Sequence, residues 1–260
     1  MTLAPVVAGV RRVEHHMGTV ISLHAHDAPD TAVERFFDEI RALEALMSRF
    51  DDDSEVLRIE RGELTFDDAS PQVREVIGRC EDLRSSTGGA FDHRPIIDGE
   101  RYLDPNGFAK GWIVEQALVH LQLAGVSSYF VNAGGDVVVG APPPGRSSWR
   151  VGIAHPEEPT AVLATIRLDR SAIATSGCYE RGEHIRRTRT RETDDLASVS
   201  VIGPELATAD ALATAVFAGG RPRPSWWRCD SSYGIIASTA SGRVLYTDDL
   251  TGLVQVGTAS

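Results

Sequence analysis

The sequence predicts an α/β fold of the α+β mixed kind, with mixed sheets flanked by helices. Helical and strand-like patterns alternate along the 260 residues without a long linker between them. Of these residues 42% are hydrophobic and 24% are charged, as in a globular protein large enough for one large core or two modest ones. The interleaved patterns favour one structural unit over residues 1–260, within which two subdomains can intertwine.

In the N-terminal part, residues 13–26 suit a strand, and Asp30-Thr31 with Glu34 resembles a helix start with a capping box. A short helix is expected at residues 55–61, and a longer one ends at the glycine pair Gly88-Gly89. The two longer helices are recognised by apolar residues at helical spacing. These residues are Val33, Phe36, Phe37, Ile40, Leu43 and Met47 in the first, and Val73, Val76, Ile77, Cys80 and Leu83 in the second.

In the C-terminal part, a third helix opens at residues 107–111 and ends at Gly125. Two short strands then flank a glycine turn at residues 132–136, and a last helix is expected at residues 208–218. The predicted strands are 129–131, 137–139, 149–153, 162–168, 173–174 and 198–202, followed by β segments within 233–256.

The charge balance argues against a nucleic-acid partner. The chain has 26 basic and 37 acidic side chains and a formal charge of −11, whereas nucleic-acid-binding proteins usually present a basic face. The three cysteines lack metal-binding spacing, and neither a signal peptide nor a membrane span is recognised. We therefore expect a cytoplasmic protein without a membrane span.

A carboxylate and a hydroxyl stand four residues apart in the last predicted helix. Asp210 and Thr214 therefore share one helix face, flanked by alanines. Two hard oxygen ligands on one face suit Mg²⁺, which takes one or two carboxylates and completes its shell with water and phosphate oxygens. The alternative is that Asp210 only favours the helix macrodipole and that Thr214 is exposed.

Four glycine-rich turns accompany this pair, at residues 87–92, 106–111, 132–136 and 175–177. Glycine lets backbone amides approach a phosphate or a planar ring closely, and amides at a helix start can hold an anion. None of the turns matches a P-loop or a dinucleotide-binding fingerprint, so those two nucleotide sites are not expected.

Eight motifs in a fixed order give the chain its resemblance to a known family. They are Met17-Gly18-Thr19, Met47-Ser48 with Ser54-Glu55-Val56, residues 87–92, Leu103-Asp104 with 107–111, residues 132–136, residues 174–177 with Tyr179-Glu180-Arg181, His184-Ile185, and residues 209–214. In this order the chain resembles the ApbE family of FAD:protein FMN transferases over residues 17–219.

The resemblance implies an FAD-binding catalytic domain that cuts FAD into AMP and FMN with the help of Mg²⁺. The FMN is then attached by a phosphoester bond to a threonine or serine of an acceptor flavoprotein. Some relatives instead hydrolyse FAD to FMN and AMP, and a third alternative is a flavin-binding protein without turnover.

By position, the resemblance also assigns residues to the site. Asp210 and Thr214 match the metal-binding pair, and Gly107 matches the position that completes it through its backbone carbonyl. The flavin-nucleotide contacts are matched by Met17, Phe50, Ala90, Phe91, Asp92, Asp104, Lys110 and Ile185. The alternatives are a solvated helix-start lysine for Lys110, a core aromatic for Phe91 and plain packing for Met17.

One segment departs from the family pattern. Family members continue from the His-Ile pair into a closing turn with Asp, Pro and Gly, whereas residues 186–191 here are Arg-Arg-Thr-Arg-Thr-Arg. These arginines either bind nucleotide phosphate as an altered lid or form a solvated loop. His184 is a candidate proton carrier for the incoming hydroxyl, or it orients a neighbour.

Overall fold

The computed structural model describes residues 9–156, 158, 160–177, 196–227 and 232–256 of the chain. The helices are α1 Asp30–Met47, α2 Glu55–Glu60, α3 Pro71–Ser86, α4 Asn106–Leu123 and α5 Leu206–Gly219, with a 3₁₀ turn η2 at Asp248–Leu250. The first strands are β1 Val10–His16, β2 Thr19–Ala25, β3 Ile96–Ile97, β4 Glu100–Arg101, β5 Tyr129–Ala133, β6 Asp136–Val139 and β7 Trp149–Ala154. They are followed by β8 Val162–Leu168, β9 Ser171–Gly177, β10 Leu196–Gly203, β11 Gly234–Thr239, β12 Val244–Tyr246 and β13 Val254–Val256.

The strands form one large sheet and two small ones. The large sheet has eight strands in the order β1-β2-β5-β6-β9-β10-β11-β12, a three-stranded sheet has the order β13-β8-β7, and β3 pairs with β4. The expected α/β class is confirmed. The sheets differ from the mixed sheets of that expectation in one respect, because every strand pair among the described residues is antiparallel. Tight turns join β1 to β2 and β5 to β6, as antiparallel pairing allows, whereas longer connections join β2 to β5 and β6 to β9.

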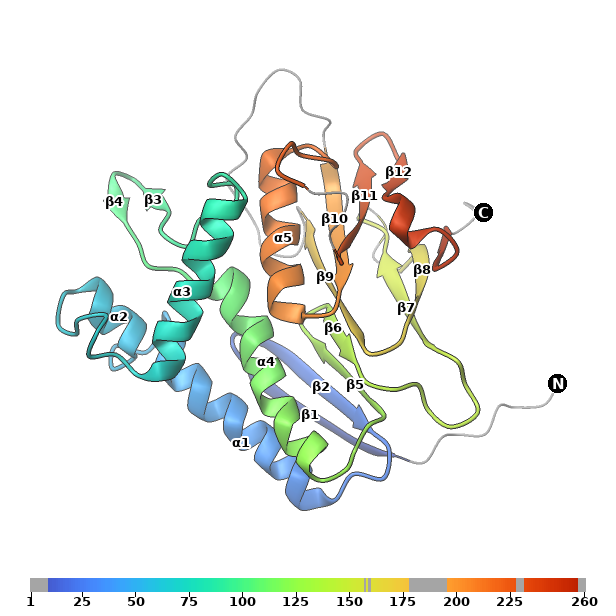
Figure 1. Ribbon diagram of the computed structural model, residues 1–260, viewed down its shortest axis with the longest axis horizontal. Helices are drawn as coiled ribbons and strands as arrows, with labels where there is room; N and C mark the ends of the chain where they lie inside the picture. Colours follow the sequence, from blue (N-terminus) through green and yellow to red (C-terminus); the bar gives the residue numbers. More distant parts are fainter. Residues whose placement is uncertain (1–8, 157, 159, 178–195, 228–231, 257–260) are drawn as a thin grey trace.

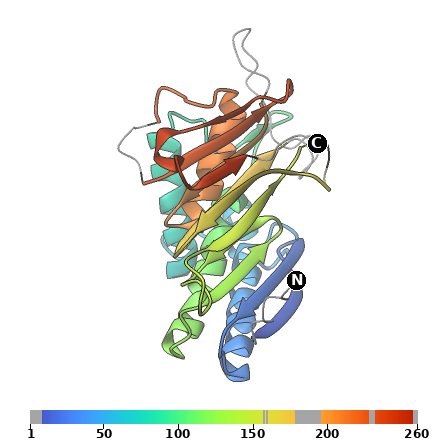
Figure 2. The same ribbon diagram turned by 90° about the vertical axis from the view of Figure 1, so that its right-hand side faces the viewer.

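Helices cover one face of the large sheet and the three-stranded sheet covers the other (Figures 1 and 2). One hydrophobic core fills the space under α1, α4 and α5, and a second lies between the two sheets. All four residues of β6 are buried, with Val138 in the first core and Val137 and Val139 in the second. The two cores therefore share this strand.

The structure corrects two local expectations near the N-terminus. Residues 13–26 are not one strand but the hairpin β1–β2, because Met17 and Gly18 have φ angles of 52° and 67° and form its turn. Positive φ at both central residues matches the right-handed twist of the strands. The capping box is also absent. Helix α1 begins at Asp30, but its N-cap is Pro29 and no side chain caps it.

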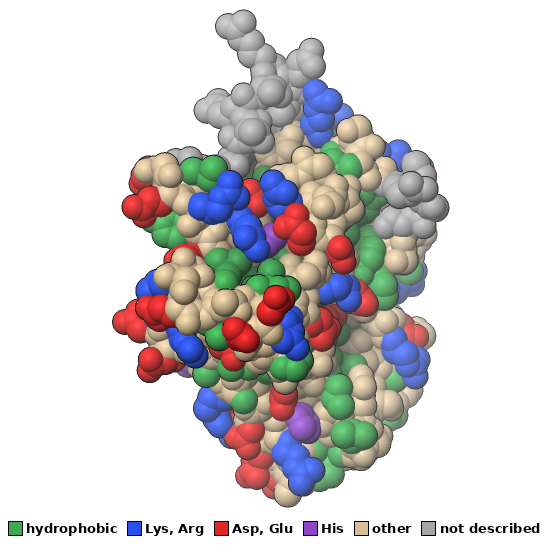
Figure 3. All heavy atoms as spheres, turned by 60° about the vertical axis from the view of Figure 1, so that its left-hand side comes forward, with side chains coloured by type: hydrophobic (Ala, Val, Ile, Leu, Met, Phe, Trp, Pro, Cys, Tyr) green, Lys and Arg blue, Asp and Glu red, His purple; other side chains and the backbone are tan. Residues whose placement is uncertain are grey.

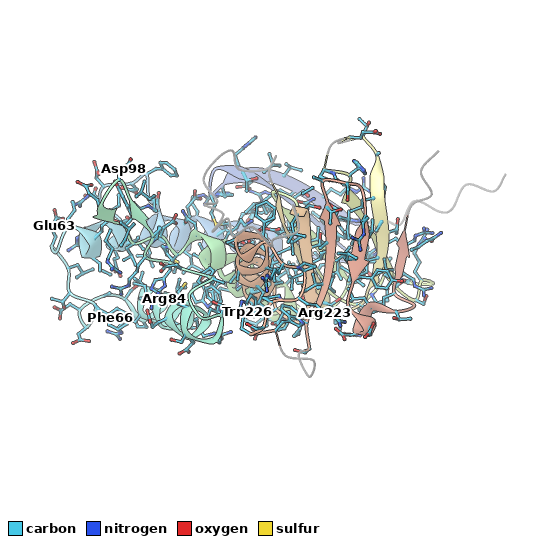
Figure 4. All side chains as sticks on the ribbon, turned by 90° about the horizontal axis from the view of Figure 1, so that it is seen from above. Glu63, Phe66, Arg84, Asp98, Arg223 and Trp226 are labelled. Carbon is cyan, nitrogen blue, oxygen red and sulfur yellow. The ribbon has the colours of Figure 1, made fainter. Side chains whose placement is uncertain are left out.

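A second hairpin, β3–β4, was not expected from the sequence. Its turn residues, Asp98 and Gly99, have φ angles of 53° and 88°. Figure 4 shows Asp98 at the tip, far from the large sheet. An Asp-Gly pair is a strong hairpin signal. The flanking strands have only two residues each, all exposed, so the alternation of buried and exposed residues that identifies longer strands is missing.

Helices α4 and α5 cross in close contact. A Cβ atom on Gly111 would lie 2.6 Å from both the Cα and the N of Ala207, which is too close for any side chain. The glycine on α4 and the alanine on α5 therefore let the two backbones approach. Their approach determines which residues of the two helices face each other.

The carboxylate of Glu115, one turn after Gly111, accepts hydrogen bonds from the backbone N–H groups of Leu206 and Ala207 in the first turn of α5. Burial raises the pKa of Glu115 to about 7, and the charge of Glu205 acts in the same direction. The two amide hydrogen bonds and the charge of Arg79 lower the pKa but do not offset the burial. Ionisation of Glu115 in the folded protein therefore lowers the free energy of unfolding.

We predict that Gly111→Ala destabilises the fold by about 1–3 kcal/mol, because the new methyl group forces α4 and α5 apart. Urea unfolding of both proteins measures the difference. The matched control is Gly78→Ala in α3, where the new Cβ would have no atom within 4 Å apart from its chain neighbours and the backbone of its own helix. We expect that change to stabilise α3 by about 0.5–1 kcal/mol. Equal free energies for Gly111→Ala and wild type would contradict the close crossing.

We also predict a pH dependence of stability that Glu115→Gln removes. The pKa of Glu115 rises on folding from its ordinary 4.5 to about 7, so the folded state binds the extra proton in this window. The stabilisation is fully present below pH 4.5 and is lost as the pH rises through about 7. Between pH 5 and pH 8.5 the wild type should lose about 2–3 kcal/mol relative to Glu115→Gln, measured by urea unfolding. A constant difference between the two proteins would contradict this prediction.

Candidate functional site

Two buried carboxylates and one ammonium group meet where α4 and α5 cover the start of β6. The side chains of Asp136 and Asp210 are only 2% and 1% exposed. The Lys110 Nζ forms an ion pair with Asp136 Oδ2 and lies 3.4 Å from Asp210 Oδ2. Lys110 is therefore not a solvated lysine, since it places one positive charge between two buried negative ones. Burial of this kind requires such pairing, because an unpaired ion is costly away from water.

Asp136 links this cluster to strand β9. Its Oδ1 accepts the backbone N–H of Thr175 at 2.9 Å, while its Oδ2 faces Lys110. From the sequence alone Asp136 is only the last residue of a glycine turn, with no predicted role. The available signal was an acidic residue directly after Gly134-Gly135, whose φ angles of 64° and 100° form the turn between β5 and β6.

Thr214 lies one turn after Asp210 on α5, beside the start of α4. Its Oγ1 is 3.3 Å from Ser176 Oγ on β9. A Cβ atom on Gly107 would lie 3.7 Å from that Oγ1 and 3.2 Å from the ring of Phe91. Gly107, Thr214 and Phe91 are therefore close neighbours. The alternative expected Asp210 only to favour the helix macrodipole and Thr214 to be exposed. In the structure Asp210 is buried beside Lys110 and Thr214 is half-buried.

Phe91 follows α3, and only 3% of this residue is exposed. Its N–H donates to Thr87 Oγ1 at 3.1 Å, and Thr87 caps the end of α3. Phe91 belongs to the first core, as its alternative assignment expected, yet its ring edge also faces Gly107. Ala90, just before it, is half-buried against the same core.

Asp92 and Asp104 lie on two neighbouring segments that precede α4. The Asp104 N–H donates to the carbonyl of His93 at 2.8 Å, so the two segments are tied together. Asp92 pairs with Arg84 of α3 at 3.2 Å, and Figure 4 marks where Arg84 lies on that helix. Asp104 accepts the N–H of Asn106 at 3.2 Å, at the start of α4.

An ion pair between Arg49, which follows α1, and Glu60 at the end of α2 holds the backbone next to Asp104. Glu60 accepts the N–H of Leu103 at 2.5 Å, and Arg49 donates to the carbonyl of Leu103. The Nη1 atom of Arg49 lies 2.8 Å from Oε2 of Glu60. Burial alone would raise the pKa of Glu60, but the hydrogen bonds from Arg49 and Leu103 and the charge of Arg49 lower it. Glu60 therefore stays ionised and fixes the segment that leads into α4.

The remaining predicted contacts lie elsewhere or outside the described residues. Phe50 is 96% exposed. Met17 is half-buried in the β1–β2 turn, where its N–H donates to Glu44 Oε1 at 2.6 Å. His184 and Ile185 fall outside the residues that the structure describes.

Surface charge around these elements is mixed. Figure 3 shows the side of the molecule that carries α2, α3 and the β3–β4 hairpin in Figure 1. Acidic and basic side chains are interspersed on this face. A cavity of about 460 Å³ lies elsewhere, toward the C-terminal end of α4. Its walls include Glu115, Gln122, Tyr129 and Arg170, and none of the predicted site residues lines it. The cluster around Asp210, and not this cavity, is therefore the candidate site.

The chemistry of the cluster suits Mg²⁺ better than a metal with many side-chain ligands. Within the described part of the chain, no group of three His, Cys, Asp or Glu side chains could hold a metal ion. Asp210 and Thr214 offer one carboxylate and one hydroxyl on a single helix face, and Gly107 brings its backbone next to Thr214. Mg²⁺ usually takes few protein ligands and keeps water or phosphate oxygens, so the donors present fit this ion.

No helix in the described residues is long and apolar enough to cross a membrane.

Comparisons with known proteins give a consistent result. A family model described as the ApbE family matches residues 17–95 and 96–232. A curated FAD:protein FMN transferase from Rhodobacter capsulatus is 34% identical over 160 residues, which cover 57% of this chain and 30% of that protein. One from Vibrio cholerae is 32% identical over 135 residues, covering 48% of this chain and 40% of that protein. The chain thus matches less than half of the length of these curated relatives.

Solved structures show the same fold. The flavin transferase ApbE from Vibrio cholerae has a TM-score of 0.79 at 22% identity, covering 95% of this chain and 99% of that chain. The ApbE protein from Thermotoga maritima has a TM-score of 0.76 at 19% identity, with the same coverage.

We predict strong energetic coupling between Lys110 and Asp136. Lys110→Met should destabilise the fold by about 3–5 kcal/mol, because it leaves two buried carboxylates without their cation. Asp136→Asn removes one of these charges but keeps an acceptor for the Thr175 N–H. The double variant should therefore lose at least about 1 kcal/mol less than the sum of the single losses, measured by urea unfolding.

The matched control is the exposed pair Asp38 and Arg41 on α1, which are 2.6 Å apart. Its coupling should stay below about 1 kcal/mol. Equal coupling in the two pairs would show that the buried ion pair is not as the structure describes it.

Proposed function

Because this chain belongs to the ApbE family, we propose that it is a Mg²⁺-dependent FAD:protein FMN transferase. It cleaves FAD to AMP and attaches FMN to a threonine or serine of an acceptor flavoprotein. The names of the curated relatives support the reaction. The observation that carries the proposal is the convergence of buried Asp210, Thr214 and Gly107 beside Lys110. We take residues 1–260 as a single FAD-binding catalytic domain.

Asp210 and Thr214 would hold the Mg²⁺ with the backbone carbonyl of Gly107. When bound, Mg²⁺ offsets the negative charge that develops on the diphosphate oxygens during phosphoryl transfer. Asp210 suits this role because the fold buries it among alanines, where its charge is screened least by water. Thr214 suits it because Ser176 orients its hydroxyl from the neighbouring strand.

The other residues of the site bind and orient the nucleotide. Lys110 lies at the start of α4, within reach of the phosphates that the proposal places beside Asp210. Asp92 and Asp104 are acceptors for N–H and O–H groups of the nucleotide, and Arg49 with Glu60 fixes the segment of Asp104. Phe50 offers an exposed aromatic face for a ring of the ligand. Met17, Ala90, Phe91 and Ile185 complete the proposed contacts.

The proposed reaction is a displacement at the FMN phosphorus. A bond forms between the acceptor hydroxyl oxygen and this phosphorus, and the bond to the bridging oxygen breaks. AMP leaves with the bridging oxygen. The hydroxyl proton must be removed, and His184 is the proposed carrier. In-line positioning of the two oxygens is the main requirement for such a transfer.

We predict that incubation with FAD and Mg²⁺ releases AMP, and that EDTA abolishes the release. Asp210→Ala and Thr214→Val should each lower the rate about a hundredfold or more, because several kcal/mol of charge stabilisation are lost. Chromatography of AMP measures the rate. Asp38→Ala, on the exposed face of α1, is the matched control and should keep the wild-type rate.

The form of the flavin product distinguishes the alternatives. FMN linked to an added flavoprotein that carries a threonine or serine acceptor supports the transferase. AMP with only free FMN indicates an FAD pyrophosphatase, in which water replaces the hydroxyl. Tight FAD binding without AMP indicates a binding protein. Wild-type AMP release by Asp210→Ala would refute the metal assignment.

A further inference from the structure

The first turn of α5 is held by a residue of another helix. Glu205, at the N-cap position, makes no side-chain cap hydrogen bond. Its carboxylate instead accepts from Thr208 at 2.8 Å and pairs with Arg79 at 3.0 Å. The N–H groups of Leu206 and Ala207 bond to Glu115 of α4. A carboxylate at this end of a helix also complements the helix dipole.

One stripe of α4 follows α5 from its first turn to Thr214. Glu115 holds the first turn of α5, and Gly111 contacts Ala207. Lys110 reaches Asp210 one turn further along, and Gly107 lies beside Thr214 in the turn after that. The spacing of 107, 110, 111 and 115 is that of one helix face. The cap on α5 and the proposed metal-binding pair are thus consecutive contacts in a single interface.

The fold does not need an ionisable group at position 115 to fill the space there. Glu115 is largely buried, the charge of Glu205 raises its pKa and the charge of Arg79 lowers it. Tyr129 and Arg170 line the same cavity as Glu115. A neutral amide would fill the same space without the cost of a buried charge. Only a carboxylate offers two equivalent oxygens to two adjacent N–H groups. Its distinctive effect is therefore to fix the start and the axial position of α5.

We propose that Glu115 is a positioning residue, which sets α5 so that Asp210 and Thr214 meet the metal with the Gly107 backbone. The inference rests on the proposed function and extends it to a residue outside the metal and nucleotide contacts. Without the cap, the first turn of α5 loosens, and the turn that carries Asp210 follows directly after it. Loss of a residue that orients metal ligands typically lowers metal affinity or activity about 10–100-fold. Because Glu115 acts on the position of the ligands and not on the reacting atoms, we expect metal affinity to change more than the metal-saturated rate.

The test compares wild type, Glu115→Gln and Glu115→Ala by hydrogen exchange and by the Mg²⁺ dependence of AMP release. In Glu115→Ala, amides 206 and 207 should exchange about tenfold faster. The Mg²⁺ concentration at half-maximal rate should rise about tenfold or more, with a smaller change in the saturated rate. Glu115→Gln keeps one acceptor and should lie between wild type and Glu115→Ala in both measurements. It also serves as the test if Glu115→Ala does not fold.

The matched control is Glu39→Gln. It removes a carboxylate whose Oε2 lies 3.3 Å from Nε2 of His120, near the C-terminal end of α4. It should leave both measurements unchanged. Unchanged exchange in Glu115→Ala would overturn the cap. Faster exchange with an unchanged Mg²⁺ requirement would reduce Glu115 to a structural role and overturn the inference. Absence of AMP release by the wild type would overturn the proposed function, and the positioning role with it, while the exchange rates would still judge the cap.

Discussion

The contact of Gly111 with Ala207 is the constraint on which the candidate site depends. Because neither residue has a large side chain, the backbones of α4 and α5 come close enough for Lys110 to reach Asp210 and for Gly107 to lie beside Thr214. Any larger side chain at the crossing would separate all of these pairs together. A site assembled in this way owes its geometry to helix packing more than to the conformation of a loop.

Charge pairing decides which groups can be buried at that crossing. Two carboxylates with one ammonium leave a net negative charge in a place that water hardly reaches. The backbone N–H of Thr175 stabilises Asp136 further. A cluster with a net negative charge repels an anion that arrives alone. It can hold a cation that arrives together with a phosphate. The electrostatics of the cluster are therefore compatible with the ligand that the proposed function requires.

Periodicity along the sequence predicted much of the fold but little of its tertiary contacts. Helices α1 and α3 were predictable because one face of each carries apolar residues at helical spacing. Helices α4 and α5 are buried on most sides and show in the sequence as apolar stretches that end near a glycine. The turn at Met17 was not, since methionine rarely adopts positive φ and only Glu44, distant in sequence, holds its N–H. The spacing of Asp210 and Thr214 predicted that they share one helix, as they do on α5, and their metal-binding role stays a prediction. Asp136 was not, because only the folded sheet brings it to Lys110.

Strand β6, which begins with Asp136, is enclosed by both hydrophobic cores. The carboxylate is therefore attached to the least deformable part of the molecule, and displacing it would require repacking on two sides. A ligand that meets such a group has little conformational entropy to remove from the protein. In the proposed function, the affinity of the site would thus depend in part on residues of the sheet interior such as Val137 and Val139, which pack in the second core.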